Sequence, residues 1–273
     1  MPNLIRQLFI TTLLLSLFSL SHPSNVIAAS QPQNFTPTQI EKLENLFDQA
    51  LNTSNNGDFT NAEQLWTQIL KQYPDNPAIW SNRGNVRLSQ NKIEAAISDY
   101  EKAIEIVPLA PDPYLNRGIA YERLQQWSEA IADYNQVIEL DPTDPVAYNN
   151  RGNAEGGLGE WEKATADYQK ASELAPEYAF ARANYALALY QIGQTQKAVQ
   201  TIKNLVRKYP NFADMRAALT ACLWSQGKKG EAESNWVATV GLDPRYQDLD
   251  WVANIRRWPP TLVDSLEKFL KIR

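Results

Sequence analysis

The sequence predicts an all-α protein, a solenoid of six tandem helical hairpins followed by a C-terminal capping helix. Three observations predict it. Prolines recur every 34 residues, alanines recur with the same period, and each period holds two stretches of apolar residues at helical spacing. The prolines are Pro74, Pro108, Pro142, Pro176, Pro210 and Pro244, and the alanines are Ala62, Ala96, Ala130, Ala164, Ala198 and Ala232.

Residues 1–29 have the pattern of a secretory signal peptide. Arg6 precedes an uncharged apolar run over residues 8–20, and small residues, Ala28 and Ala29, end a short polar stretch. The run is short for a spanning helix, so we expect cleavage, with an uncleaved membrane anchor as the alternative. The absence of a twin arginine and of a nearby cysteine favours general secretion, to a periplasm or a thylakoid lumen.

The remaining chain divides into a linker, six repeats and a cap. Residues 30–42 contain the linker and the start of the first helix, which Thr36 opens as a capping box with Gln39. Residues 43–246 hold the six repeats, and residues 247–273 form the C-terminal capping segment. The repeats span residues 43–76, 77–110, 111–144, 145–178, 179–212 and 213–246.

Each repeat is expected to form two helices joined by a tight turn. The 34-spaced proline cannot continue a helix and so ends the second one. Small residues at 34-residue intervals let the two helices of a unit approach closely, and four turns carry a glycine suited to a helix C-cap. The small residues are Gly84, Gly118, Gly152 and Ala186, and the turn glycines are Gly57, Gly159, Gly193 and Gly227.

One unit carries the signature positions of a known family. They are Trp80, Gly84, Ala96, Tyr100, Ala103 and Pro108. The chain therefore resembles the tetratricopeptide repeat family, which implies a right-handed α–α superhelix whose concave face binds proteins. The Asn-Arg-Gly triplets and the export pattern resemble the tetratricopeptide proteins of cyanobacteria and plastids.

Arginines replace the family's usual leucine in three units, and only those units carry an aspartate 16 residues later. This joint occurrence predicts a structural ion pair between the two helices of each unit. The pairs are Arg83 with Asp99, Arg117 with Asp133 and Arg151 with Asp167.

Asparagines form the candidate binding row. The resemblance places the first helix of each unit on the concave face, where asparagines recur every 34 residues. Because a carboxamide both donates and accepts, such a row can bind the backbone of an extended peptide; the alternative is that each asparagine bonds the neighbouring repeat. The row is Asn82, Asn116, Asn150 and Asn184, and Asn85, Asn149 and Asn153 are expected on the same face.

An apolar partner surface is the second candidate. The basic residues of the family's carboxylate-clamp subclass are missing from the matching positions, so apolar contacts to a partner are favoured. The same side chains could equally be repeat core. They are Phe47, Leu51, Leu115, Ile119, Phe180, Leu187 and Trp224.

The composition narrows the function. The net charge of −5 argues against nucleic-acid binding, and the only histidine, His22, lies in the predicted signal. Together with a single cysteine, Cys222, this disfavours a zinc site or a histidine-assisted nucleophile, and we expect no catalysis, cofactor or small-molecule substrate. The expected function is a protein-binding scaffold or assembly factor. The acidic residues 30–196 and the basic residues 197–273 leave weak self-association as the alternative.

Two further segments have two interpretations each. Gly156 and Gly157, next to Gly159, are interpreted as a tolerated weak turn, and the less favoured interpretation is a hinge or a point of close approach. The C-terminal segment is either a cap on the last hairpin or a docking element rich in tryptophan and arginine. The residues of the docking interpretation are Trp251, Arg256, Arg257 and Trp258.

Overall fold

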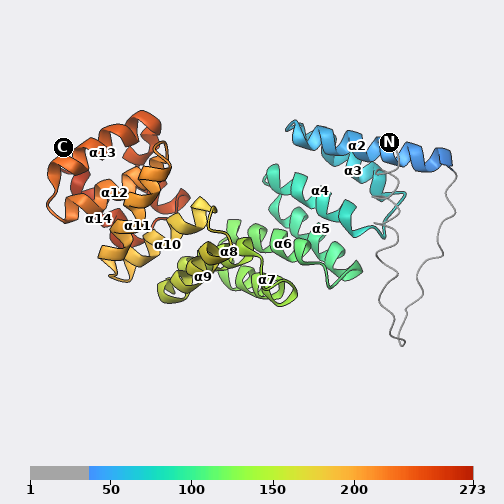
Figure 1. The fold of residues 1–273 in the computed structure, drawn as a ribbon. Coiled ribbons are helices and arrows are strands. Elements are labelled where there is room, and N and C mark those ends of the chain that lie inside the picture. The colour runs from blue at the N-terminus through green and yellow to red at the C-terminus, as the bar shows by residue number, and fades with distance from the viewer. Residues whose placement is uncertain (1–36, 273) are drawn as a thin grey trace, which may run out of the picture. The chain divides into compact units, whose positions relative to one another are not determined.

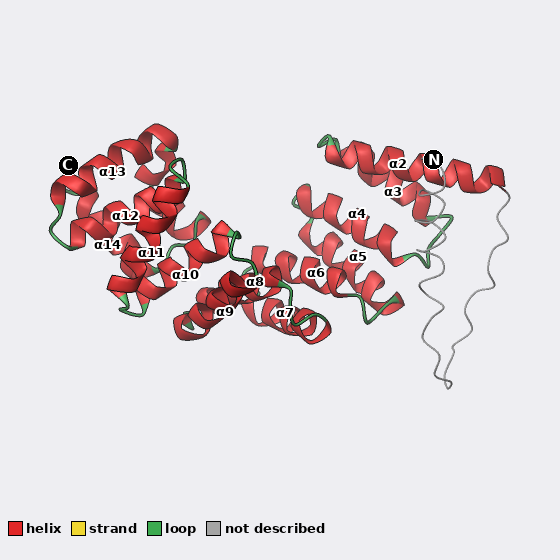
Figure 2. Ribbon diagram, in the orientation of Figure 1, coloured by secondary structure: helices red, strands yellow, loops and turns green. Residues whose placement is uncertain are grey.

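The computed structural model describes residues 37–272 and confirms the predicted all-helical fold (Figures 1 and 2). The predicted signal, most of the linker and Arg273 lie outside the described residues. The chain divides into two compact units within its first described helix, and the units are Met1–Asn45 and Leu46–Arg273. The second unit contains the repeats that follow that helix.

Thirteen long helices succeed one another in the described part of the chain (Figure 1). The first helices of the hairpins are α2 (Pro37–Asn55), α4 (Pro77–Ser89), α6 (Pro111–Arg123), α8 (Pro145–Gly157), α10 (Ala179–Gln191) and α12 (Ala213–Ser225). The second helices are α3 (Phe59–Leu70), α5 (Ile93–Ile106), α7 (Trp127–Leu140), α9 (Trp161–Leu174), α11 (Thr195–Lys208) and α13 (Lys229–Leu242). Short 3-10 and π turns, Pro244–Gln247 and Trp251–Ile255, lead to α14 (Pro260–Leu270).

The turn between the two helices of a hairpin requires a left-handed residue. The four predicted turn glycines have φ between 74° and 80°, and the second and third hairpins place Asn91 and Gln125 there, at φ 60° and 57°. At each of these positions the next backbone N–H reaches back to a carbonyl five residues earlier, as Gln126 does to Tyr121 at 2.9 Å. The predicted C-caps are therefore confirmed, and two of the six turns adopt them without glycine.

Close approach within a hairpin depends on the small residue of the first helix. A Cβ added to Gly84 or Gly118 would lie 2.6 Å from the ring of Tyr100 or Tyr134, the aromatic residue of the second helix. Since real Cβ atoms do not approach so closely, only glycine fits against the tyrosine there. The period of 34 residues thus reflects one packing contact repeated from unit to unit.

The three predicted arginine–aspartate pairs are confirmed, and each is bidentate. Arg117 donates from Nε and Nη2 to Asp133 at 2.9 and 2.7 Å, and the pairs of the second and fourth units repeat this geometry. Each guanidinium also lies against an aromatic ring three residues earlier on its own helix, as Arg83 does over Trp80 at 4.8 Å. These pairs fix the first helix of a unit against the second.

Candidate functional site

The predicted asparagine row runs along four consecutive first helices. Asn82, Asn116, Asn150 and Asn184 stand on α4, α6, α8 and α10, and each is partly exposed. The row therefore presents side-chain amides along the same helix face in units 2 to 5, which satisfies the first requirement of a peptide-binding row.

Units 4 and 5 use their asparagines to join neighbouring repeats. Asn184 donates to Asn149 Oδ1 at 3.0 Å and to Asn153 Oδ1 at 3.3 Å, and Asn149 donates to Asn150 Oδ1 at 3.2 Å. Asn149 is buried within this network. In these two units the asparagines therefore join neighbouring repeats, which was the alternative to peptide binding.

Units 2 and 3 differ. Within residues 37–272, neither Asn82 nor Asn116 has a hydrogen-bond partner for its side chain, although both are only partly exposed. Asn85 is exposed and accepts a hydrogen bond from Tyr100 at 2.8 Å, which leaves its amide nitrogen free to donate. These amides are available to a partner.

The apolar candidates separate into core and surface. Leu187 is buried in the core shared by α10, α12 and α14, so its assignment to a partner surface is corrected: those helices cover it. Phe47 and Trp224 are half-buried and stack edge-on against Trp66 and Phe269 at 5.0 and 5.3 Å.

The remaining apolar candidates reach solvent in part. Leu115 and Ile119 of α6 and Leu51 of α2 are partly exposed, and Phe180 is 57% exposed with one edge against Phe212. Leu115 precedes Asn116 on α6, and Ile119 follows it by three residues. Both pack in part on the repeat cores, and their partly exposed surface lies near an unpaired amide.

In the structure the C-terminal segment begins earlier than predicted, at Pro244, and residues 244–272 are anchored by a buried carboxylate. Asp214 of α12 is 4% exposed and receives Tyr246 at 2.7 Å, Trp258 Nε1 at 2.9 Å and Arg256 Nη2 at 2.5 Å. Burial and the charge of Asp214 raise the pKa of Tyr246, which keeps its hydroxyl a hydrogen-bond donor. Two residues of the docking interpretation, Arg256 and Trp258, are therefore bound within the chain.

Helix α14 packs on first helices as well as on the last hairpin. It contacts α12 and α10, and Phe269 lies between Trp224 and Trp236 at 5.3 Å from each ring. Tyr190 and Ser265 share a buried hydrogen bond of 3.2 Å, and the backbone N–H of Thr261 donates to Gln191 Oε1 at 3.0 Å. The segment thus covers the first helices of units 5 and 6.

A second anchor lies 135 residues back along the sequence. Arg257 donates to Glu122 Oε2 at 2.9 Å and to the Glu122 carbonyl at 3.3 Å, and its guanidinium lies 5.0 Å from the centre of the Trp127 ring. A Cβ added to Gly157 would lie 2.6 Å from that ring. Gly157 is therefore a point of close approach, the less favoured interpretation of the glycine pair.

Sequence reasoning missed Asp214, Glu122 and Gln191 as anchors. Glu122 is the only acid at its repeat position, where the other five units have Ser54, Leu88, Gly156, Tyr190 and Trp224. That break in the pattern was the available signal. Its partner, Arg257, lies outside the repeats, so no repeat position could have indicated it.

Glu155 of α8 is a buried carboxylate that the fold does not satisfy. It is 8% exposed, and its Oε2 has no hydrogen-bond partner in the described residues. Burial, and next the charge of Asp167, raise the pKa of Glu155 to about 7. Because the pKa of Glu155 in the folded chain lies above its ordinary value of 4.5, the contribution of this group to stability is fully present below about pH 4.5 and is lost as the pH rises through 7.

We therefore expect Glu155→Gln, which cannot ionise, to be more stable than the wild type by about 1–3 kcal/mol above pH 7 and by little at pH 5. Denaturant unfolding at pH 5, 6, 7 and 8 measures this difference. Glu139→Gln, at an exposed carboxylate of α7, is the control and should show no such trend. A gain for Glu155→Gln that is equal at every pH would contradict the assignment.

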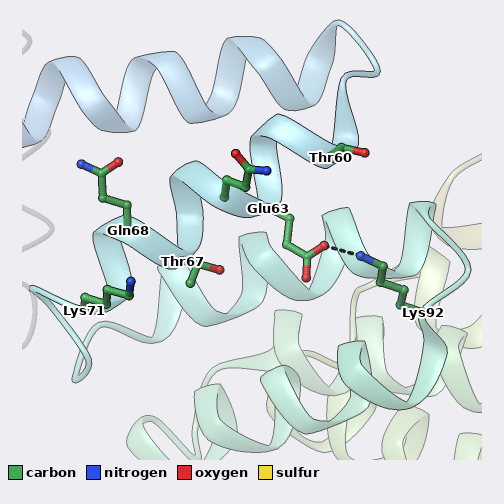
Figure 3. Close-up of a pocket in the computed structure, with 7 residues that line it drawn as sticks. Thr60, Glu63, Thr67, Gln68, Lys71 and Lys92 are labelled. Carbon is green, nitrogen blue, oxygen red and sulfur yellow. Dashed lines mark hydrogen bonds and ion pairs between the residues drawn. The ribbon is translucent and has the colours of Figure 1, made fainter.

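A polar pocket beside α3 was not singled out by the sequence (Figure 3). Its lining includes Thr60, Glu63, Thr67, Lys71 and Lys92. Glu63 already binds Lys92 at 2.6 Å and Arg87 at 2.9 Å; although burial raises its pKa, these hydrogen bonds hold the pKa at about 2. Glu63, the one carboxylate among the lining residues, is thus already paired with cations of the same chain.

Family models describe most of the chain. Models of the tetratricopeptide repeat match residues 44–76, 84–125, 123–156 and 157–234. No helix among residues 37–272 is long and apolar enough to cross a membrane.

Solved structures show the same fold at low identity. A tetratricopeptide repeat protein from Parabacteroides merdae is 19% identical, with 85% of this chain and 93% of that chain covered and a TM-score of 0.66. YrrB, described as a tetratricopeptide protein with an unusual peptide-binding site, is 18% identical, with 74% and 97% covered and a TM-score of 0.55. MamA is 21% identical, with 62% and 92% covered and a TM-score of 0.54.

Proposed function

Because the chain belongs to the tetratricopeptide-repeat family, whose members are generally protein–protein interaction scaffolds, we propose that it binds an extended segment of a partner protein along α4, α6 and α8. The observation that carries the proposal is the pair of partly exposed, unpaired amides of Asn82 and Asn116, at equivalent positions of adjacent units, with Leu115 and Ile119 beside them. The C-terminal segment covers the corresponding helices of units 5 and 6, so the partner lies on units 2 to 4.

The chain itself supplies a precedent for this mode of binding. Gln191, near the end of a first helix, uses its side-chain amide to accept the backbone N–H of Thr261. A first-helix carboxamide thereby binds a main-chain N–H of the first turn of α14, whatever side chain that residue carries. Asn82 and Asn116 can hold a partner's main chain by the same chemistry.

The pattern of residues 1–29 supports export by general secretion, to a periplasm or a thylakoid lumen. In that compartment the protein acts as a scaffold or assembly factor that brings one protein to another. No catalytic step is part of this function.

We expect Asn82→Ala/Asn116→Ala to bind the partner about tenfold more weakly, since each lost hydrogen bond contributes roughly 0.5–1.5 kcal/mol. Crosslinked affinity capture from the native compartment, with quantitative mass spectrometry, measures the loss. The matched control is Gln68→Ala/Gln136→Ala, which removes two amides from second helices. Equal capture by both double variants, each folded as judged by circular dichroism, would refute the assignment of the site.

A further inference from the structure

The carboxylate of Glu122 is held in place from inside the repeat array. It lies in the last turn of α6, and its Oε1 accepts the hydroxyl of Tyr134 at 2.6 Å, which leaves Oε2 for a second donor. Its backbone carbonyl accepts the N–H of Gln125 at 3.0 Å and has a second lone pair for another donor. Burial raises the pKa of Glu122, so an unpaired ionised form is costly and a cationic ligand is favoured. The acid is a fixed acceptor for a cation.

The indole of Trp127 forms the wall of this acceptor. It begins α7 and lies against Gly157 of the next unit, where no other residue leaves room for the ring. A planar cation that enters here meets a ring face, a carboxylate oxygen and a main-chain carbonyl together. That set matches a guanidinium, which donates from several nitrogens in one plane and stacks on aromatic faces.

Arg257, which occupies the site in this chain, is held less firmly than the residues that form the site. The side chain of Arg257 remains 40% exposed, whereas that of Glu122 is 10% exposed. Arg257 has φ 53°, a left-handed conformation that is unfavourable for a residue other than glycine. The site is thus set by α6, α7 and α8, while the arginine depends on a strained turn between Trp251–Ile255 and α14.

Glu122 also shares a face of α6 with Leu115 and Ile119, the apolar residues of the proposed binding surface. Glu122 lies one helical turn beyond Ile119 on α6 and two turns beyond Leu115, so a segment bound along these residues reaches it. The fold does not require an acid at this position, because the other five units have Ser54, Leu88, Gly156, Tyr190 or Trp224 there.

We propose that Glu122, Trp127 and Gly157 form an arginine-binding site for a segment of a partner protein, which Arg257 occupies in cis until the partner's arginine displaces it. The inference rests on the proposed function, because it adds a side-chain requirement to the partner that units 2 to 4 bind. Displacement frees the side chain of Arg257, while Asp214 still holds its neighbours Arg256 and Trp258.

The site is tested first with purified full-length chain and a small probe. Arg257→Ala should bind N-acetyl-argininamide, detected by a shift of the Trp127 indole N–H resonance, and should bind N-acetyl-lysinamide at least threefold more weakly. Wild type should bind both probes more weakly than Arg257→Ala does. Arg257→Ala/Glu122→Gln should show no shift of the Trp127 resonance. Equal binding of the two probes, or equal binding by wild type and Arg257→Ala, would overturn the site.

The partner is tested by the capture experiment described for the asparagine row. Arg257→Ala should capture the same partner severalfold more strongly than wild type, and Arg257→Ala/Glu122→Gln should fall below Arg257→Ala. If the asparagine double variant loses the partner but Arg257→Ala captures no more than wild type, the proposed function stands and this inference fails. If wild type forms a dimer that Arg257→Ala abolishes, the arginine received is that of a second copy, which also overturns it.

Discussion

Asp214→Ala is expected to lower the free energy of unfolding by about 3–5 kcal/mol, since it removes a buried acceptor and leaves Arg256, Trp258 and Tyr246 without their partner. The loss should be local. Hydrogen exchange should lose its protection in residues 244–272, while α4 to α7 keep theirs, because each hairpin of a solenoid depends mainly on its neighbours.

Asp112→Ala provides the matched control. Asp112 stands at the equivalent position of α6, is exposed, and has no partner among the described residues. We expect a change below about 0.5 kcal/mol for its removal from the first turn. A loss of protection spread evenly over all units of Asp214→Ala would show that the carboxylate does not act as a local anchor.

Asp99→Ala is expected to destabilise the fold by a similar amount, about 3–5 kcal/mol. Asp99 is 1% exposed and accepts from Arg83 Nε and Nη2 at 3.0 and 2.7 Å and from Arg87 Nη1 at 3.0 Å. Its removal leaves the buried Arg83 with only the hydroxyl of Thr67, at 3.2 Å. Denaturant unfolding measures the difference.

A double variant separates pairing from packing. Arg83→Leu/Asp99→Ala removes both charges and should be less destabilised than Asp99→Ala alone, because an apolar residue at position 83 needs no partner. Lys102→Ala breaks an exposed ion pair with Glu105 and should change stability by less than about 0.5 kcal/mol. Additive losses in the double variant would contradict a coupled buried pair.

Features that follow the repeat were predictable, because one packing solution recurs at each period. The proximity of Gly84 to Tyr100 and the pairing of Arg117 with Asp133 are each implied by residues at fixed offsets within one hairpin. The left-handed residue at Gln125 was not predicted, since glutamine carries no turn signal and is placed there by the flanking helices.

The C-terminal contacts could not be derived from the sequence for a different physical reason. The contact between Arg257 and Glu122 depends on how several successive hairpins pack on one another, because 135 residues separate the two. No local sequence pattern reveals the result of that packing. The asparagine row shows the same limit: Asn116 and Asn150 occupy equivalent positions, yet Asn150 has Asn149 beside it as a donor and Asn116 has Leu115. Equivalent positions share a backbone but not their neighbours.

The contact between Arg257 and Glu122 also bears on how such an array evolves. Linear arrays readily gain or lose whole units, because every hairpin contacts only those beside it. Here the loss of one unit between the two residues would bring Leu88 opposite Arg257, and a duplication would bring Gly156. Neither residue can accept a hydrogen bond from a guanidinium through its side chain. This ion pair therefore forms only with the present number of repeats between the two residues.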